Sequence, residues 1–493
     1  MSAAPATRPA CPDCRARDAT IARLEQQLAR QQRPIDDLRR QLDEARRTGK
    51  RQAAPFRRRA HSPSPKKPGR PKGHPPAARP LPDHVDRTID VPCDVCPDCQ
   101  VPLVDPVVHP QYQTDLPPVV PIVTRFDVHG GTCPCCRRYH QGRHPEMTSD
   151  AVGACANQIG PVALTMAAEL KHRLGVPYRK ITDFFTTYFD LRVSPGTLAR
   201  AEQRLAARAR PTFELLLDAL RRCGVVHADE TGWRIGRLGA WLWVCSSATV
   251  TLYAIRTSRG HEVPQEILGA DFSGWLVVDG LNSYDVLGYA KGRCNAHLLR
   301  RACRLAEELP KQREAAYVGR LVALLREALD LAERREELTE VGYARRVAQV
   351  EGALDDWIDD FQPRFSADVD RLVHHVCAHR GEWLVFLHEP EVPPTNNHGE
   401  RMLRPAVISR KVGGCNKTLL GACVHAILAS LMVSLHQQGR RFLDLALRLW
   451  RSPEAEAIDL EGLPRRAAAR PEDGGPQESS PPGDLPVAFV PTG

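Results

Sequence analysis

The sequence lacks a hydrophobic run long enough to cross a lipid bilayer. The longest apolar stretch, residues 421–435, is shorter than the ~20 residues that a transmembrane helix needs, and it contains His425. The first residues also lack the basic cluster and apolar segment that mark a secretory leader. These two absences argue against an integral membrane or exported protein, and we expect a soluble cytoplasmic one.

Acidic residues are missing from residues 46–79, which hold 12 of the 68 Lys and Arg residues. The formal net charge of the chain is +9, so this segment carries the basic character and the remainder is slightly acidic. Apolar side chains are also scarce from residue 46 to 82, so burial cannot offset the entropy of ordering. We predict a disordered basic linker over residues 46–84 that binds a polyanion; a merely solvating segment is the alternative.

Inside this linker, residues 66–73 have the sequence Lys-Lys-Pro-Gly-Arg-Pro-Lys-Gly, which resembles an AT-hook. In that motif an extended Arg-Pro segment places arginine in the narrow minor groove of A·T-rich DNA. Arg70 and Lys72 are therefore predicted DNA contacts. Basic proline-rich linkers also match this motif by chance, which is the alternative interpretation.

A leucine-rich heptad pattern precedes the linker. Apolar residues occupy most a and d positions from Ile21 to Leu42, which predicts a coiled coil within residues 1–45. Pro34 interrupts the pattern, and a proline inside a helix costs about 3 kcal/mol, so two short helices are the alternative. A coiled coil predicts self-association into a homo-oligomer.

The chain has 16 cysteines and no recognisable secretory leader, which favours free thiols or metal ligands over disulfides. Two pairs, Cys96 with Cys99 and Cys133 with Cys136, have the CxxC spacing that supplies two thiolates to a tetrahedral Zn²⁺ site. Together they predict a DNA-binding zinc ribbon over residues 85–150.

The assignment within the cysteine-rich region leaves alternatives. Cys93 or Cys135 could replace one of the four predicted ligands. Residues 119–128 have the pattern of a β-strand and are expected to pair between the two CxxC elements. Cys11 and Cys14 form another CxxC without a partner pair, and we predict no metal there.

A helical domain is predicted over residues 151–222. Within it, residues 178–189 are expected to form a helix and residues 190–193 a turn. Ser194 and Pro195 then suit the N-cap and first position of a second helix. The arrangement fits a helix-turn-helix that contacts DNA, and equally an ordinary pair of antiparallel helices.

Three consecutive strands are predicted next. Residues 224–231 suggest a buried strand that ends at Asp229, and residues 241–244 and 249–255 suggest two more. Three strands joined by short connections predict an antiparallel meander. Asp229 would then lie at an edge of the sheet.

A second aspartate follows a fourth strand. After a short helix over residues 263–268, residues 274–280 predict an apolar strand that ends at Asp279. A right-handed crossover would place this strand parallel to the first, with both carboxylates at the same edge. Neighbouring carboxylates repel each other unless a cation lies between them, and Mg²⁺ prefers oxygen ligands. The pair predicts a metal site.

A third carboxylate lies after a long helical stretch, in residues 395–405, Thr-Asn-Asn-His-Gly-Glu-Arg-Met-Leu-Arg-Pro. Asn396 or Asn397 could cap the helix that carries Glu400. Gly399 weakens the expected helix start by about 1 kcal/mol. We expect Glu400 to face the two aspartate-bearing strand ends.

Four motifs occur in this order along the chain: Asp-Glu-Thr from residue 229, Asp-Gly-x-x-x-Tyr from residue 279, Cys-x-x-His-x-x-Arg-Arg from residue 294 and Asn-x-x-x-Glu-Arg-x-x-Arg-Pro from residue 396. Together they resemble the IS66 family of insertion-sequence transposases. The resemblance extends over nearly the whole chain, including the leucine-rich amino terminus and the cysteine-rich region.

The resemblance implies an α/β fold with an RNase H-like catalytic core. The core would occupy residues 223–300 and 393–450, interrupted by a helical insertion over residues 301–392. A disordered tail is predicted from 451 to 493, where Pro, Gly, Glu and Ser dominate.

For activity, the resemblance implies a DDE transposase that cleaves DNA at the ends of an insertion sequence and joins it to a target. Asp229, Asp279 and Glu400 would be its catalytic acids and would hold two Mg²⁺ or Mn²⁺ ions. The implied partners are the terminal inverted repeats, target DNA and small accessory proteins of the same element, at the nucleoid.

Basic residues follow Glu400 closely, and we predict that they contact DNA phosphates: Arg401, Arg404, Arg410 and Lys411. A solvated basic helix face is the alternative. Two alternative functions stay open. One is a catalytically inactive DNA-binding regulator derived from a transposase, and the other is an RNase H-like nuclease that only hydrolyses strands.

Neighbouring residues compete for roles in the site. Glu230 should point to the opposite face from Asp229, and Asp285 should lie in a loop beyond the strand end. Cys294 and His297 could bind a metal or pack at a helix start. We favour the structural role because only two ligands are adjacent in sequence.

Overall fold

The computed structural model describes residues 79–104, 107–117, 119–153, 157–452, 454–460 and 463. The chain divides into two units, residues 1–115 and 116–493. The predicted coiled coil, the AT-hook-like motif with Arg70 and Lys72, and the first CxxC pair at Cys11 lie outside the described residues.

The first unit, as far as it is described, is extended chain around one tight turn. Val95 and Pro102 form an isolated antiparallel bridge that closes this turn. In the second unit a hairpin of β1 (Gly130–Thr132) and β2 (Tyr139–Gln141) frames a turn of the same kind.

The strand predicted over residues 119–128 does not form. The described residues there are extended but pair with no described strand, and Val120, Ile122 and Val123 are exposed. Pro121 interrupts the segment and has no N–H to donate to a ladder. The prediction was wrong because β-branched residues alone do not supply a pairing partner.

Three helices follow: α2 (Pro161–His172), α3 (Tyr178–Phe189) and α4 (Pro195–Arg221). Asp190 ends α3 in the left-handed conformation, at φ 48°. The Ser194 side chain accepts a hydrogen bond from the Thr197 N–H at 3.1 Å, which confirms the predicted N-cap. The two predicted helices are therefore confirmed, and α4 continues beyond them to pack on the central sheet.

The central sheet has the order β5-β4-β3-β6-β7, and its strands are β3 (Val225–Ile235), β4 (Leu238–Ser246), β5 (Thr251–Arg256), β6 (Trp275–Val278) and β7 (Ala290–Arg293). The first three strands form an antiparallel meander, and β6 is parallel to β3, as predicted. The parallel edge strand β7 was not predicted.

The prediction that the first strand ends at Asp229 was wrong. β3 continues to Ile235, because its second half pairs with β4 and buries Trp233 and Ile235. Gly236, at φ 59°, makes the tight turn into β4. Asp229 therefore lies in mid-strand, opposite the end of the shorter β6.

Helices cover both faces of the sheet, and the strand residues alternate between two cores. Leu242 and Val244 of β4 pack with residues of α12 (Asn397–Gly413) and α13 (Leu419–Gln437). Trp243 and Cys245 pack on the other face with residues from α4 and α5 (Glu262–Leu268). This period of two is the strand pattern that burial of both faces requires.

Helix α13 is long and apolar enough to cross a membrane by composition alone, but most of it is buried. Its residues contribute to both sheet-facing cores; Leu428 and Leu431 lie in one and Ala429 and Val433 in the other. Its hydrophobic character is accounted for by this position in the protein core.

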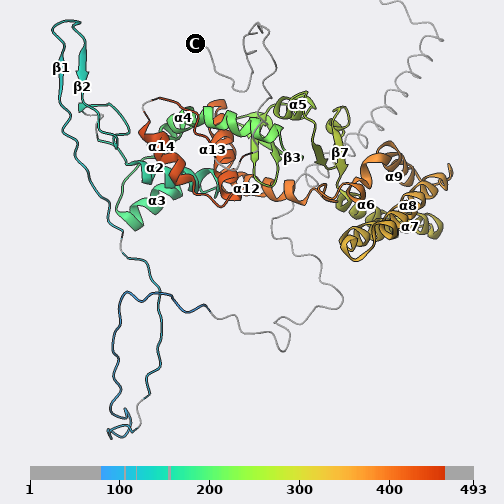
Figure 1. Ribbon diagram of the computed structural model, residues 1–493, viewed down its shortest axis with the longest axis horizontal. Helices are drawn as coiled ribbons and strands as arrows, with labels where there is room; N and C mark the ends of the chain where they lie inside the picture. Colours follow the sequence, from blue (N-terminus) through green and yellow to red (C-terminus); the bar gives the residue numbers. More distant parts are fainter. Residues whose placement is uncertain are drawn as a thin grey trace, which may run out of the picture. The chain divides into compact units, whose positions relative to one another are not determined.

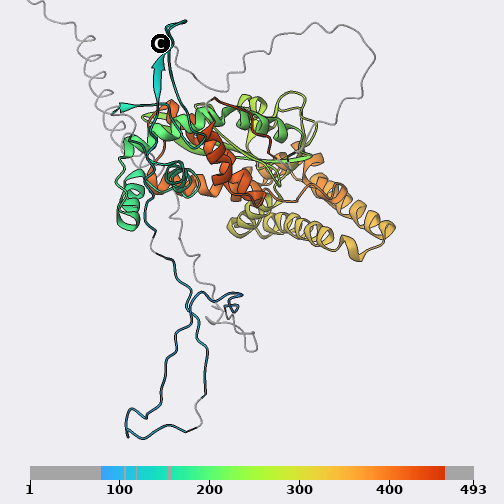
Figure 2. The same ribbon diagram turned by 60° about the vertical axis from the view of Figure 1, so that its left-hand side comes forward.

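The helical insertion forms a separate core beyond β7, where its helices gather in Figure 1. Its elements are α6 (Asn295–Glu308), α7 (Gln312–Glu333), η3 (Arg335–Glu337), α8 (Glu340–Asp359), α9 (Ala367–Ala378), α10 (Arg380–Trp383) and α11 (Val385–His388). The long helices α7 and α8 run side by side in Figure 2, and Tyr317 stacks on Trp357 with ring centroids 4.9 Å apart. Leu298 of α6 belongs to this core, so the insertion begins a few residues before the predicted 301.

The last described residues correct the predicted tail. After α14 (Phe442–Arg451), Ile458 and Leu460 are buried in the main core. The Ile458 N–H donates a hydrogen bond to the Thr212 hydroxyl at 3.1 Å. This part of the predicted tail therefore belongs to the folded core, because two apolar side chains at alternate positions suffice to anchor an extended segment.

Candidate functional site

The sheet register brings the two aspartates together. His227 of β3 is the parallel partner of Val277 of β6, and Asp229 and Asp279 each follow these partners by two residues. Asp279 comes directly after β6, and its Oδ1 accepts a hydrogen bond from the Leu281 N–H at 2.9 Å. The backbone ladder thus places both carboxylates at one level of the sheet.

The same register decides which face Asp229 occupies. Because side chains alternate along a strand, Asp229 shares its face with His227 and Thr231. His227 contacts Asn396 at the start of α12, and Thr231 accepts a hydrogen bond from Arg410 later in that helix. Asp229 therefore faces the layer that contains Glu400.

Burial and neighbouring carboxylates raise the pKa of Asp229. Burial of the carboxyl is the largest cause of a rise in its pKa to about 7. The negative charges of Glu230 and Asp279 raise the pKa further, and Glu400 adds a smaller effect. A hydrogen bond of 2.9 Å from the Glu230 N–H acts in the opposite direction. A cation would relieve this repulsion, because carboxylate oxygens are preferred ligands of Mg²⁺ and Mn²⁺.

Asn396 holds the start of α12 against β3. Its Nδ2 donates to the Ala228 carbonyl at 2.8 Å, and its Oδ1 lies 3.0 Å from Nδ1 of His227. Burial lowers the pKa of His227 to about 4, so the ring is neutral and its Nδ1–H donates to Oδ1. The Asn396 backbone N–H donates to the Cys294 sulfur at 3.1 Å. One fully buried amide thus connects the sheet, the insertion and the helix of Glu400.

Sequence reasoning predicted the position of Asn396 but not its role. Asn396 is the N-cap residue of α12, yet its side chain makes no capping hydrogen bond. The position of the Asn396 side chain also explains why residue 399 is a glycine. A Cβ at this position would lie 2.7 Å from Oδ1 of Asn396. The only sequence signal for this arrangement was a glycine where a helix former was expected.

His398 anchors the same turn of α12 to the sheet from another side. Its Nε2 lies 2.8 Å from the Ser246 hydroxyl and 2.9 Å from the Ser247 carbonyl. The ring also contacts His227, with centroids 5.0 Å apart. Glu400, two residues later, is therefore on a helix turn with fixed polar contacts.

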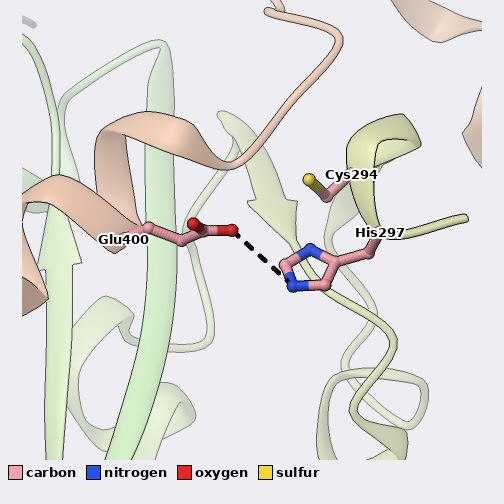
Figure 3. A group of neighbouring side chains, drawn as sticks. All are labelled: Cys294, His297 and Glu400. Carbon is pink, nitrogen blue, oxygen red and sulfur yellow. Dashed lines mark ion pairs between the residues drawn. The ribbon is translucent and has the colours of Figure 1, made fainter. Parts of the chain in front are cut away.

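Glu400 lies near the start of α6 in the insertion, as Figure 3 shows. Its Oε1 is 3.6 Å from Nε2 of His297 and 4.0 Å from the nearer guanidinium nitrogen of Arg300. Potential ligand atoms of Cys294, His297 and Glu400 lie within 4.8 Å of one another. The structural role predicted for Cys294 and His297 rested on finding only two potential ligands. The structure adds Glu400 as a third potential ligand.

The two rival acids have other partners. Glu230 faces away from Asp229, and it accepts hydrogen bonds from Arg259 at 2.7 Å and from Tyr284 at 3.1 Å. Asp285 lies in the loop after the short helix η2 (Asn282–Tyr284) and pairs with the buried Arg293. Both locations agree with the expected ones.

Arg293 also joins the second aspartate to the insertion. Its side chain is 1% exposed, and its Nε donates to Glu382 of α10 at 2.6 Å. Its Nη1 lies 3.3 Å from the Asp279 carbonyl oxygen. Together with Asp285, these contacts satisfy a guanidinium that would otherwise be costly to bury.

The predicted DNA contacts on α12 differ in their surroundings. Arg401, Arg404 and Lys411 are exposed. Arg410 is half-buried, and its Nη1 donates to the Thr231 hydroxyl at 2.9 Å and to the Gly232 carbonyl. Arg410 therefore has a packing contact with β3, and the DNA contacts of all four residues stay predictions.

The first described CxxC pair forms a tight turn. The Cys96 N–H donates to the Val101 carbonyl at 2.9 Å, and the Gln100 N–H donates to the Cys96 carbonyl at 3.0 Å. Gln100 has φ 58°, and the sulfurs of Cys96 and Cys99 are 3.4 Å apart. Backbone N–H groups, that of Cys99 first, lower the pKa of the Cys96 thiol.

The second pair repeats this turn in the β1–β2 hairpin. The Cys133 N–H donates to the Arg138 carbonyl at 2.9 Å, and the Arg137 N–H donates to the Cys133 carbonyl at 2.9 Å. Arg137 has φ 55°, and N–H groups, that of Cys136 first, lower the pKa of the Cys133 thiol. The two turns share the same backbone hydrogen-bond pattern. Zinc binding by these four cysteines, with Cys93 or Cys135 as alternatives, stays a prediction.

Comparison with known proteins gives two results. The family model described as "Transposase IS66 family" matches residues 157–423. A protein of Sinorhizobium fredii, "Uncharacterized protein y4jD", is 24% identical over 295 residues, which cover 54% of this chain and 57% of that protein. The chain thus aligns with little more than half of this relative, whose name assigns no activity. The family match, in contrast, includes more than half of the present chain, from α2 through β3, β6 and the helix of Glu400, and this protein belongs to the IS66 family of transposases.

Proposed function

We propose that this protein is a DNA transposase of the DDE type, which cleaves DNA at insertion-sequence ends and transfers the strands to a target. The observation that carries the proposal is the placement of Asp229 and Asp279 at one level of the sheet, on the face that contains Glu400. Membership of the transposase family supports the same assignment.

The sheet supports an RNase H-like catalytic core. An antiparallel meander followed by two parallel strands, in the order β5-β4-β3-β6-β7, agrees with the fold that the sequence resemblance implied. The first acid lies on the central strand β3 and the second directly after its parallel neighbour β6. A helix after the insertion then supplies the third acid.

In this proposal Asp229, Asp279 and Glu400 hold a pair of Mg²⁺ or Mn²⁺ ions. When bound, such a pair supplies Lewis acidity for in-line displacement at a phosphodiester, with water or a 3′-hydroxyl as nucleophile. The chain itself contributes position: the β3–β6 ladder fixes two acids, and the Asn396 contacts fix the turn before the third. Burial and the neighbouring carboxylates raise the pKa of Asp229 to about 7, so a bound cation would favour its ionised form at neutral pH.

DNA binding would come from several regions. The two CxxC turns would hold Zn²⁺ through Cys96, Cys99, Cys133 and Cys136 in a zinc ribbon. The exposed Arg401, Arg404 and Lys411 lie on the helix of Glu400, where they suit the phosphates beside the scissile bond. The basic linker, a homo-oligomer formed through the leucine-rich amino terminus and accessory proteins of the element complete the proposed cytoplasmic assembly at the nucleoid.

The test is incubation of the purified full chain with the DNA that flanks its own gene, in Mg²⁺ or Mn²⁺, while cleavage and strand joining are scored. Asp279→Asn should lower cleavage by roughly 10³-fold, because a carboxamide cannot replace the charge that holds the cation. Binding to the element ends should remain. Asp271→Asn, an exposed aspartate just before β6, is the matched control and should cleave normally.

Different outcomes separate the alternatives. Cleavage without strand joining would indicate an RNase H-like nuclease. End binding without cleavage by the unaltered chain would indicate a DNA-binding regulator. Undiminished cleavage by Asp279→Asn would refute the assignment of the catalytic acids.

A further inference from the structure

The start of α6 presents an unusual set of ligands to Glu400. Cys294 is buried, and His297, one helical turn later, is half-exposed. Both side chains and the Glu400 carboxylate point into the same space between α6 and α12 (Figure 3). A thiol, an imidazole and a carboxylate are the three ligand types that Zn²⁺ accepts in proteins.

Two buried atoms in this group lack hydrogen-bond partners. Nδ1 of His297 and Oε1 of Glu400 are shielded from solvent and lack a hydrogen bond among the residues that the structure describes. Oε1 has the longer ion-pair contacts with His297 and Arg300 noted above. Buried polar atoms are nearly always satisfied, so each unsatisfied one requires an explanation. A bound cation satisfies acceptor atoms directly.

The sulfur of Cys294 accepts a backbone hydrogen bond that suits a metal ligand. The Asn396 N–H donates to this sulfur at 3.1 Å. An N–H donor beside a thiolate is the kind of outer contact that orients and stabilises a metal ligand.

We propose that Cys294, His297 and Glu400 form a zinc-binding site. Bonds of about 2.0–2.3 Å to a tetrahedral ion require ligand atoms roughly 3.5 Å apart, and the present atoms lie within 4.8 Å of one another. Side-chain movements of about 1 Å would therefore close the site. Three protein ligands leave the fourth position for water or a substrate oxygen.

This site has a consequence for Glu400 that rests on the proposed function. A carboxylate bound beside Cys294 and His297 is held toward α6, whereas catalysis requires the same carboxylate beside Asp229 and Asp279. Zn²⁺ and the Mg²⁺ pair would then compete for one side chain. Zinc would act as an inhibitor of cleavage, and loss of Cys294 would relieve the inhibition.

The binding test uses the full chain without DNA, so that its result does not depend on transposition. We would measure bound Zn²⁺ per chain and the sulfur-to-metal charge-transfer absorption after loading with Co²⁺. Cys294→Ser should remove one metal ion per chain and part of the absorption, and His297→Asn and Glu400→Gln should weaken Zn²⁺ binding at this site by more than about 100-fold. Cys303→Ser, on the same helix but outside the group, is the matched control for loss of one thiol.

An unchanged metal count and absorption in Cys294→Ser would overturn the proposal. So would a loss confined to Cys294→Ser with normal binding in His297→Asn and Glu400→Gln, because a lone thiol would then explain the spectrum. Circular dichroism of each variant separates loss of the site from loss of the fold. Normal zinc binding without inhibition of cleavage would refute only the competition for Glu400.

Discussion

The carboxylates on the sheet and the carboxylate on α12 are positioned in different ways. Asp229 and Asp279 depend on backbone pairing between β3 and β6, which no single side-chain substitution removes. Glu400 comes from a helix that begins after the helical insertion, whose elements run from Asn295 to His388. The first turn of that helix is held by side-chain contacts of Asn396 and His398. The comparison teaches that two parts of one proposed site should differ in their sensitivity to mutation.

Among changes that leave the three proposed catalytic acids in place, the largest expected effect comes from removal of the buried amide of Asn396. Asn396→Ala should lower cleavage by roughly 10- to 100-fold, because a displacement of about 1 Å at a catalytic group has effects of this size. End binding should be retained, and the lost buried hydrogen bonds should reduce stability by about 1–3 kcal/mol. Single-turnover cleavage and a filter-binding assay measure the two properties.

Asn397→Ala is the control for this variant, because Asn397 is the next residue and is exposed. It should cleave and melt like the unaltered chain. Equal cleavage by both alanine variants would mean that Glu400 does not depend on the buried amide, and the contrast between sheet and helix would fail.

A smaller effect should appear in the response of stability to pH and Mg²⁺. The pKa of Asp229 is about 7 in the folded protein, whereas the ordinary value of an aspartate outside the fold is 3.8. Protonation of Asp229 therefore favours the folded state. This contribution is fully present below about pH 4 and is lost as the pH rises through 7. Saturating Mg²⁺ should therefore raise Tm by several degrees at about pH 8 and much less at about pH 5, where protons compete.

Asp229→Asn sharpens this measurement, because an uncharged side chain no longer repels Asp279. The variant should melt at a higher temperature than the unaltered chain in metal-free buffer at about pH 8, and it should lose most of the Mg²⁺ response. A Mg²⁺ response of full size in Asp229→Asn would show that the stabilising cation binds elsewhere.

The smallest expected effect concerns two helical glycines. Gly399→Ala places a Cβ against Asn396 and should destabilise the protein by about 1–2 kcal/mol. Gly352→Ala on α8 meets no atom within 4 Å and should stabilise the insertion by about 0.5–1 kcal/mol. Urea unfolding midpoints compare the two changes.

A double variant then connects this result with the first prediction. Gly399→Ala should cost little more when Asn396 is already alanine, because the clash needs the amide oxygen. Additive losses in the double variant would show that the glycine is required for another reason.

Local patterns in the sequence were sufficient to predict that β3 to β6 exist and that β6 runs parallel to β3. Apolar runs predicted β3 and β6, and a parallel crossover placed Asp229 beside Asp279. The end of β3 was missed because pairing with β4, rather than composition, keeps residues 230–235 in the strand. The strand over residues 119–128 failed for the reverse reason: its composition was suitable but it had no partner.

The side-chain chemistry around Glu400 could not be predicted in the same way. Contacts of Asn396 with Ala228 and Cys294 join positions more than 100 residues apart, as their separations of 168 and 102 show. No periodicity within one element encodes such contacts. Cys294 and His297 were recognised as a pair in the sequence. Glu400 joins them as a third potential ligand only in the folded structure, because it follows the helical insertion.

The buried guanidinium of Arg293 links the helical insertion to the loop of Asp279, one of the proposed catalytic acids. One charged group forms hydrogen bonds with Glu382 of α10 and with the carbonyl of Asp279. A tilt of the helical insertion would therefore also move the loop that carries Asp279. A partner that binds to the insertion, whether DNA or another subunit, would thereby change the distances between the proposed catalytic acids without contacting them.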